Sequence, residues 1–320
     1  MASTINSWHN IRLIHSGEQD AGLHLVDLNL YDSSLFANVC IFQAEDHLVI
    51  FDGGTSNTTK QIINYMKFFD INADNILIVP SHHHFDHSGG LYPLLDHFKK
   101  ICKDASILTT EKMSPLLQDL ETIVKPAERQ FSKMIGEVKN ISRYDIRELK
   151  PFAKYRLDDD YKLKLVETPG HCDDHVSPII YRNDEPYLCF FGEALGINLR
   201  KHLSPLPPST APSFRSSNYL NSVEKIKSLD AEIGIFSHVG GIRGREIIKA
   251  LCDTTIEKYT EVREFIKNTY DANPVSTSEL VAMMRDKYNE YIATCVMDKE
   301  IVNNLSFLLV YGMLKDLHLK

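Results

Sequence analysis

Apolar residues along the chain follow two patterns that predict strands and helices in alternation. Apolar runs at 24–30 and 37–51 predict short strands, and Glu45-Asp46 separates two of them as a hairpin turn would. Between 59 and 69 the apolar residues recur at helical spacing on one face. The same reasoning predicts strands at 76–80, 162–166, 179–181, 188–191 and 234–237, and a helix at 219–229. This alternation predicts an α/β fold in which helices pack on sheets.

Two stretches carry mainly helical patterns. Residues 111–150 predict an insert of two or three helices, which either pads the fold or forms a lid or dimer surface beside a cleft. In 251–320, Ser276 and Glu279 predict a capping box that opens a helix through Tyr288, and a final helix is expected to end at Gly312. We therefore predict two domains, residues 1–250 with the insert and residues 251–320.

Composition places the chain among globular proteins. Of its 320 residues 43% are hydrophobic, and no apolar run approaches the ~20 residues that a membrane span needs. The N-terminus lacks a basic segment followed by an apolar one, so no signal peptide is predicted. The six cysteines form no CxxC pair, which fits reduced thiols. A cytoplasmic protein without membrane partners is expected.

The formal net charge is −8. An acidic chain is a poor general binder of phosphate backbones, and no Lys/Arg cluster stands out near the histidine-rich segment described next. The charge counts against nucleic acid as a partner without excluding it and favours a small-molecule substrate.

The segment 81–90 carries the densest candidate chemistry. It places four histidines and an aspartate within six residues, directly after the apolar run 76–80. Imidazole and carboxylate are the usual ligands of zinc and iron. A polar loop that merely caps a strand is the alternative, but five ionisable groups beside a buried strand would repel or desolvate one another without a cation. We predict a metal site.

The pattern His-x-His-x-Asp-His in this segment resembles the signature of the metallo-β-lactamase superfamily of binuclear metal hydrolases. Further motifs of that family follow in the expected order, and the resemblance covers roughly 20–245. They are His47–Gly54, Thr168-Pro169-Gly170-His171, Phe190–Ala194 and Ser237–Gly241. The resemblance implies an αββα sandwich with the metals in a cleft along one edge.

The resemblance also implies a ligand set for two divalent metal ions per chain. Zinc is expected first, with iron or manganese as alternatives. His82, His84 and His171 would hold one ion, Asp86, His87 and His238 the other, and Glu193 would bridge them. Two such ions activate a water molecule, whose orientation and proton transfer are assigned to Asp86. Asp52 is expected to buttress a ligand histidine.

Glu193 departs from the family pattern, which has aspartate at this place. The longer side chain either bridges as usual, binds only one metal, or shifts metal preference toward iron or manganese. Nearby polar residues are weaker candidates. His83 is expected to point away from the metals, His175 to be structural, and Cys172 to be packed. His202 lies in the loop after Glu193, and the proline-rich part of that loop, 203–214, is either a connector or a wall of the substrate pocket.

Three functions compete. A cytoplasmic hydrolase of a small ester, thioester or lactone comes first, because the acidic chain and the apolar proline-rich loop favour a neutral substrate. An endoribonuclease is the alternative, since Asp173-Asp174-His175 and the helical tail resemble the β-lactamase-like endoribonuclease group, whose C-terminal domain is winged-helix-like. A diiron oxygen-binding or redox protein is favoured only by Glu193. A homodimer is left open.

Overall fold

Two mixed sheets form the centre of the molecule. The computed structural model describes residues 13–14, 16–20, 22–30, 36–197, 205–238, 240–272, 275–288 and 299–320. Within them, the first sheet has the order β2 (Gly17–Asp20), β3 (Leu23–Asp27), β4 (Asn38–Gln43), β5 (Leu48–Phe51), β6 (Asn75–Val79), β7 (Asp104–Thr109), β8 (Ile146–Glu148). The second has the order β1 (Leu13–Ile14), β14 (Gly241–Arg243), β13 (Ile233–Phe236), β12 (Glu185–Gly192), β11 (Val176–Arg182), β10 (Tyr161–Glu167), β9 (Tyr155–Arg156).

Both faces of each sheet are buried in the centre, which explains the continuous apolar runs in the sequence. In β4, Cys40 and Phe42 point to the layer between the sheets, whereas Val39 and Ile41 point to the helices. Across the middle layer the ring of Phe51 stacks on that of Phe190 with centroids 5.6 Å apart. One alternating strand therefore contributes to two separate cores.

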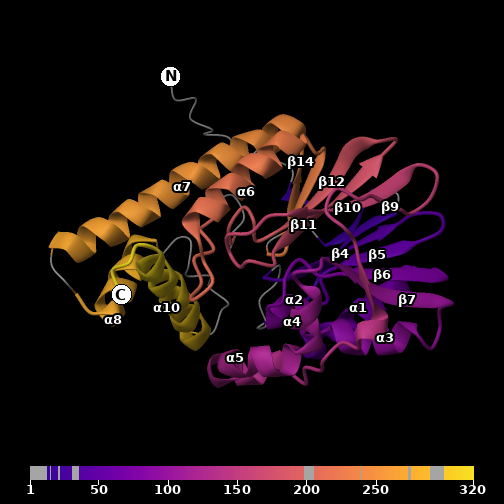
Figure 1. Cartoon of the computed structure of the whole chain (residues 1–320), viewed down its shortest axis with the longest axis horizontal. Coiled ribbons are helices and arrows are strands. Elements are labelled where there is room, and N and C mark those ends of the chain that lie inside the picture. Colours follow the sequence, from indigo (N-terminus) through magenta and orange to yellow (C-terminus); the bar gives the residue numbers. More distant parts are fainter. Residues whose placement is uncertain are drawn as a thin grey trace.

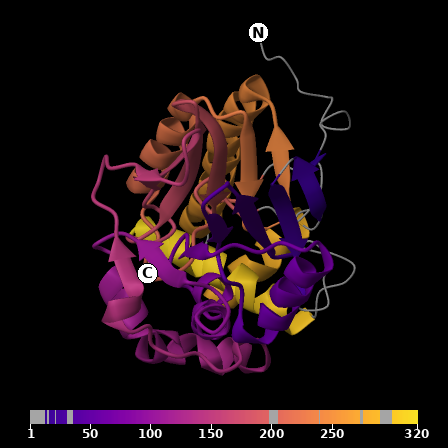
Figure 2. The same cartoon turned by 90° about the vertical axis from the view of Figure 1, so that its right-hand side faces the viewer.

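Helices cover the outer faces of the two sheets (Figures 1 and 2). Against the first sheet lie α1 (Thr59–Phe68) and α3 (Leu91–Phe98), and against the second lie α6 (Ser216–Leu229) and α7 (Arg245–Ala272). This confirms the αββα sandwich. No helix in the described part of the chain is long and apolar enough to span a bilayer.

The segment 111–150 contains α4 (Ser114–Gln118) and α5 (Leu120–Ile135), and then returns to the sheet. Its last part forms β8, which pairs in parallel with β7. The helical prediction was therefore wrong for 146–148, where a three-residue strand owes its conformation to the neighbouring strand rather than to its own pattern.

The C-terminal region is helical as predicted, with α7, α8 (Thr277–Lys287) and α10 (Lys299–Asp316). The capping box is confirmed: Glu279 N–H donates to Ser276 Oγ at 3.2 Å, and Ser276 N–H donates to the Glu279 carboxylate at 2.8 Å. Because α7 runs unbroken through 250–251 and packs on β13 and β14, the domain boundary stays a prediction.

The last helix was expected to end at Gly312, but it does not end there. A Cβ at this position would lie 1.9 Å from the Ser209 carbonyl oxygen. The glycine therefore allows α10 to lie directly against the proline-rich loop, and the helix continues to Asp316. Close approach of two backbones, rather than termination, explains this residue.

Candidate metal centre

The predicted ligands gather where strands of both sheets end. β5 and β6 run in parallel and end beside each other, which places Asp52 next to the segment carrying His82 and His84. β12 and β13 also run in parallel and deliver Glu193 and His238. Parallel strands present their carboxyl ends at one edge of a sheet, so distant residues meet there.

Hydrogen bonds between the sheets hold this edge together. Val176 N–H donates to the Ser81 carbonyl at 2.8 Å, and Asn38 N–H donates to the Ser237 carbonyl at 2.8 Å. Each bond joins one sheet to a segment adjoining the other, immediately beside a predicted ligand. The two halves of the site are therefore fixed relative to each other.

Gly89 and Gly90 follow the ligand-bearing segment between α2 (Phe85–Ser88) and α3, and both have negative φ, −62° and −85°. A Cβ on Gly90 would lie 2.1 Å from the Gly53 carbonyl oxygen. The pair thus lets the ligand-bearing segment pack against the loop that follows β5.

Three ring nitrogens form a first donor cluster. His84 Nδ1 lies 3.0 Å from His82 Nε2 and 2.8 Å from His171 Nε2. Tetrahedral zinc ligands about 2.0 Å from the ion are separated by about 3.3 Å, so the three nitrogens lie only slightly closer than a bound ion would hold them. This cluster fits one metal ion.

A second donor cluster joins Asp86, His87 and His238, whose ligand atoms all lie within 4.8 Å of one another. His87 Nε2 is buried and makes no hydrogen bond within the described chain, although Asp86 Oδ2 lies 3.5 Å away. A buried polar atom without a partner is costly, and a cation at this cluster would satisfy it. The second cluster therefore also fits a metal ion.

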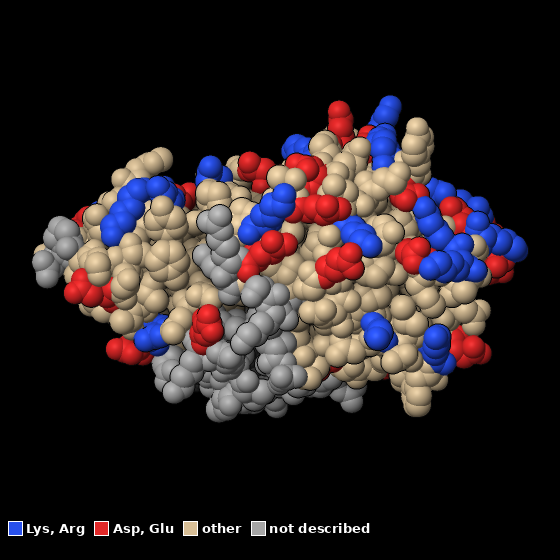
Figure 3. Space-filling view, turned by 90° about the horizontal axis from the view of Figure 1, so that it is seen from below, with Lys and Arg blue, Asp and Glu red and all other residues tan. Residues whose placement is uncertain are grey.

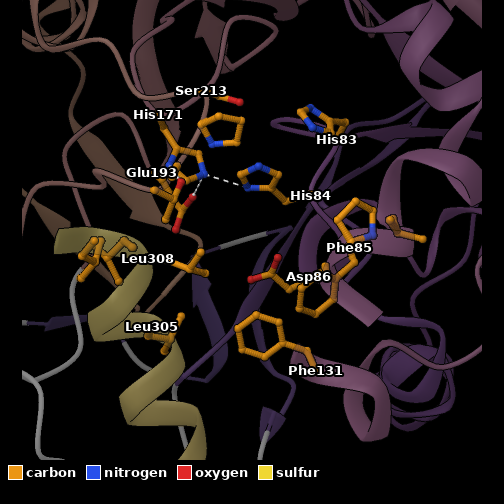
Figure 4. A pocket seen from close by; sticks show the side chains of 18 of the residues that line it. His83, His84, Phe85, Asp86, Phe131, His171, Glu193, Ser213, Leu305 and Leu308 are labelled. Atoms are coloured by element: carbon orange, nitrogen blue, oxygen red, sulfur yellow. Dashed lines mark hydrogen bonds and ion pairs between the residues drawn. The ribbon is translucent and has the colours of Figure 1, made fainter. Parts of the chain in front are cut away.

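Glu193 contacts both clusters and lies beside His171 in Figure 4. Its Oε2 is 2.5 Å from His171 Nε2 and 3.5 Å from His82 Nε2, and its Oε1 is 3.2 Å from His238 Nε2. The residue is only 4% exposed. One carboxylate oxygen thus faces each cluster, so the extra methylene leaves the carboxylate within reach of both.

The opposite nitrogen of each deeply buried ligand histidine has a partner. His171 Nδ1 donates to the Pro208 carbonyl at 2.9 Å, and His238 Nδ1 donates to the Phe36 carbonyl at 2.5 Å. In the neutral ring each bond places the proton on Nδ1 and leaves Nε2 to face the centre. Such bonds fix the tautomer and orientation of a metal-binding ring.

Asp52 holds the ring of His87 in the same way. His87 Nδ1 lies 2.7 Å from Asp52 Oδ2. The carboxylate also accepts from Ser81 N–H at 2.6 Å, from Ser81 Oγ at 3.1 Å and from Ser237 Oγ at 2.9 Å. It therefore joins β5, the segment after β6 and the segment after β13, in the position expected of a buttress.

Crowding perturbs the ring protonation. Burial, followed by repulsion from the neighbouring rings, lowers the pKa of His82 well below its usual value. Burial also lowers the pKa of His87, but the Asp86 and Asp52 carboxylates outweigh it and raise that pKa to about 10. Burial alone would raise the pKa of Glu193, yet the His171 and His238 rings lower it well below its usual value. A metal ion at this centre would have to displace the proton of His87, because ligand histidines bind in the neutral form.

Three further side chains lie beside the predicted ligands, and the Cys172 thiol is within 4.8 Å of the ligand atoms of His82, His84 and His171. Asp174 accepts from the backbone N–H of His83 at 3.0 Å and from His83 Nδ1 at 2.8 Å. His175 Nε2 accepts Glu193 N–H at 3.1 Å, while its Nδ1 donates to Thr168 Oγ1 at 2.9 Å. Both ring nitrogens of His175 are occupied, which fits a structural role. Burial raises the pKa of the Cys172 thiol, which favours the protonated form over the metal-binding thiolate.

A pocket of ≈460 Å³ opens in front of the clusters. Residues 210–213 of the proline-rich loop line it, as do side chains of α5 and α10. His202 lies outside the described residues. Leu305 and Leu308 of α10 are among the side chains that line the pocket, and no local signal in the sequence shows that they face the candidate centre.

Comparisons with known proteins agree with the fold. A curated metallo-beta-lactamase fold-containing protein from Sulfurisphaera tokodaii is 25% identical over 236 residues, covering 71% of this chain and 82% of its own. A beta-lactamase domain protein from Burkholderia ambifaria has a similar fold, with a TM-score of 0.64, 14% identity and coverage of 98% and 93%. A metallo-beta-lactamase family protein from Thermus thermophilus has a TM-score of 0.60, 16% identity and coverage of 93% and 94%.

The sequence profile of the metallo-beta-lactamase superfamily matches residues 34–238, which is more than half of the chain and includes every predicted ligand. Metal binding by these individual residues stays a prediction. The fold, the order of the motifs and this match together show that the chain belongs to the metallo-beta-lactamase superfamily.

Proposed function

We propose that this chain is a binuclear metal-dependent hydrolase that cleaves a neutral small ester, thioester or lactone. The observation that carries the proposal is the placement of two donor clusters, joined by the buried Glu193, at one side of an apolar pocket. Two divalent ions bound there would make hydroxide available at neutral pH and would polarise the substrate carbonyl.

The residues of the chain would have separate roles. His82, His84 and His171 would bind one ion, and His87 and His238, with Asp86, would bind the other. Asp86 is partly exposed toward the pocket, so it can orient the attacking water and accept its proton. The water oxygen bonds the carbonyl carbon, the acyl C–O or C–S bond breaks, and the leaving group takes a proton through Asp86.

The pocket supports a neutral substrate better than RNA. Among the described residues that line it, none is Lys or Arg. Single-stranded nucleic acid sites combine a basic groove with stacking aromatics. On the face shown in Figure 3, outside the grey atoms, basic and acidic side chains are interspersed and no basic stripe is seen.

The proposal is tested by metal analysis and a substrate panel on the purified protein. We expect about two transition-metal ions per chain, and hydrolysis of at least one ester, thioester or lactone but not of single-stranded RNA. Asp86→Ala should lower kcat/KM about 1,000-fold or more while the protein stays folded. Asp96→Ala, which removes an exposed carboxylate of α3, is the matched control and should change little.

Activity of Asp86→Ala within tenfold of the unmodified protein would show that Asp86 has neither role. Cleavage of RNA alone would favour the endoribonuclease. Reversible oxygen binding without hydrolysis would favour a diiron protein.

A further inference from the structure

The pocket is enclosed by two helices that lie outside the sandwich. From α5 come Ile123, Val124, Ala127 and Phe131, and from α10 come Leu305, Phe307, Leu308, Leu309 and Tyr311. α5 breaks at Phe131, whose φ of −131° and ψ of 23° are not helical. The ring of Phe131 packs 5.6 Å from that of Phe85 and is only 5% exposed. The break thus seats an aromatic ring in the pocket wall.

The two ends of the pocket differ in polarity. His171, Glu193 and His84 lie at one end, Leu305 and Phe131 lie toward the other, and Asp86 lies between them, as Figure 4 shows. A ligand that matches both ends needs a polar reacting group attached to an apolar body. Burying that body against aliphatic and aromatic walls supplies the binding free energy.

We propose that the pocket selects substrates that carry an aliphatic chain on the hydrolysable carbonyl group, with the chain lying between α5 and α10. This inference rests on the proposed hydrolase function of the same site. The proposed substrates are esters or thioesters with a hydrocarbon chain of medium length, which lies on either the acyl side or the leaving-group side of the carbonyl group. Leu305 and Phe131, from opposite walls, set the longest chain that fits.

The first experiment measures kcat/KM over two series of esters. One series lengthens the acyl chain on a fixed leaving group, and the other lengthens the alcohol on a fixed acetyl group. In one of them we expect a rise of about fourfold per added methylene until the pocket is filled, and then a plateau or fall. The series that responds identifies the side of the carbonyl that enters the pocket.

Two variants locate the chain. Leu305→Trp should lower kcat/KM at least tenfold for the best long substrate and leave the shortest within threefold, because the larger ring fills the end of the pocket. Phe131→Ala should move the optimum to longer chains. Lys315→Trp places the same ring on an exposed position of α10 that does not line the pocket, and is the matched control. Chain-length profiles unchanged in both pocket variants would overturn the proposal.

A binding measurement separates this inference from the proposed function. Metal-free protein is equilibrated with the apolar dye Nile red, which n-alkyl alcohols of increasing length then displace. We expect displacement to strengthen with chain length, and Leu305→Trp to weaken it for the long alcohols. This result would support the chain site even if no ester were hydrolysed. Hydrolysis with a flat response to chain length in both series, or displacement independent of length, would refute the chain site while leaving the hydrolase intact.

Discussion

Asp52 shows how much one side chain can determine in this centre. It follows β5 with a positive φ of 64°, and its carboxylate accepts hydrogen bonds from segments of both sheets as well as from His87. Asp is among the residues that tolerate this backbone conformation. The residue therefore combines an unusual backbone position with the orientation of a predicted ligand.

Replacing this carboxylate by an amide should weaken metal binding without removing a ligand. We expect Asp52→Asn to lower zinc affinity about 10- to 100-fold, because an amide cannot accept every bond that the carboxylate accepts. Competition with a chromophoric chelator measures this affinity. Asp158→Asn, at a buried aspartate that caps the turn before β10, is the control: it should lower stability but leave zinc affinity unchanged. Equal losses in both variants would reduce Asp52 to a stability role.

Glu193 gives a second test at the level of one side chain. Glu193→Asp restores the usual family residue and keeps a carboxylate between the clusters, so we expect two metal ions to remain while activity or metal preference shifts. Glu193→Ala should lose at least one ion, because it removes a carboxylate whose negative charge faces both clusters. Elemental analysis after loading with zinc, iron or manganese measures both variants. Two tightly bound ions in Glu193→Ala would argue against bridging.

At the scale of elements, α10 reaches the centre through the proline-rich loop. Gly312 brings the helix against Ser209, whose Oγ donates to the Leu309 carbonyl at 2.8 Å. The preceding residue in that loop, Pro208, supplies the carbonyl that orients His171. The C-terminal helix therefore supports a predicted metal ligand as well as walling the pocket.

This contact predicts an effect opposite to that of helix propensity. Gly→Ala inside a helix ordinarily stabilises by about 1 kcal/mol. Gly312→Ala should instead destabilise by about 1–3 kcal/mol, because its Cβ would collide with the Ser209 carbonyl. Urea unfolding measures this change, and cobalt substitution should show altered absorption bands as His171 shifts. Lys315→Ala, on the exposed side of α10, should change the free energy of unfolding by no more than about 0.5 kcal/mol. A stabilised Gly312→Ala would contradict the contact.

At the scale of the whole molecule, the predicted ligands come from both sheets. An ion that joins them stabilises only the folded chain, so its removal should lower the thermal midpoint. At a free metal concentration 100 times Kd the expected contribution is about 2.7 kcal/mol. Calorimetry before and after chelation measures it, and added zinc should restore the original midpoint. Identical midpoints in fully loaded and metal-free protein would show that the clusters hold no ion.

The sequence alone predicted the alternating strands and helices and the histidine-rich segment from local patterns, and its resemblance to a known family implied the sandwich and the full ligand set. Strand patterns depend on alternation within one segment, and the capping box depends on residues three apart. The His-x-His-x-Asp-His pattern places its donors on one short loop and helix turn, so its spacing predicts a common site. The order of the further motifs that resemble the family's then added His171, Glu193 and His238 to the predicted ligands.

Only the tertiary structure decided which distant segments meet this centre. Gly312 and Gly90 are explained by backbones that approach from far along the chain, and no local pattern contains them. The same holds for β8, whose pairing comes from β7, and for the carbonyls of Phe36 and Pro208, since any residue type offers a carbonyl. The apolar faces of α5 and α10 predict that these faces are buried. The same periodicity is expected whether such a face lines a pocket or packs in a core. Packing between separate elements, which periodicity does not encode, therefore set the shape of the pocket.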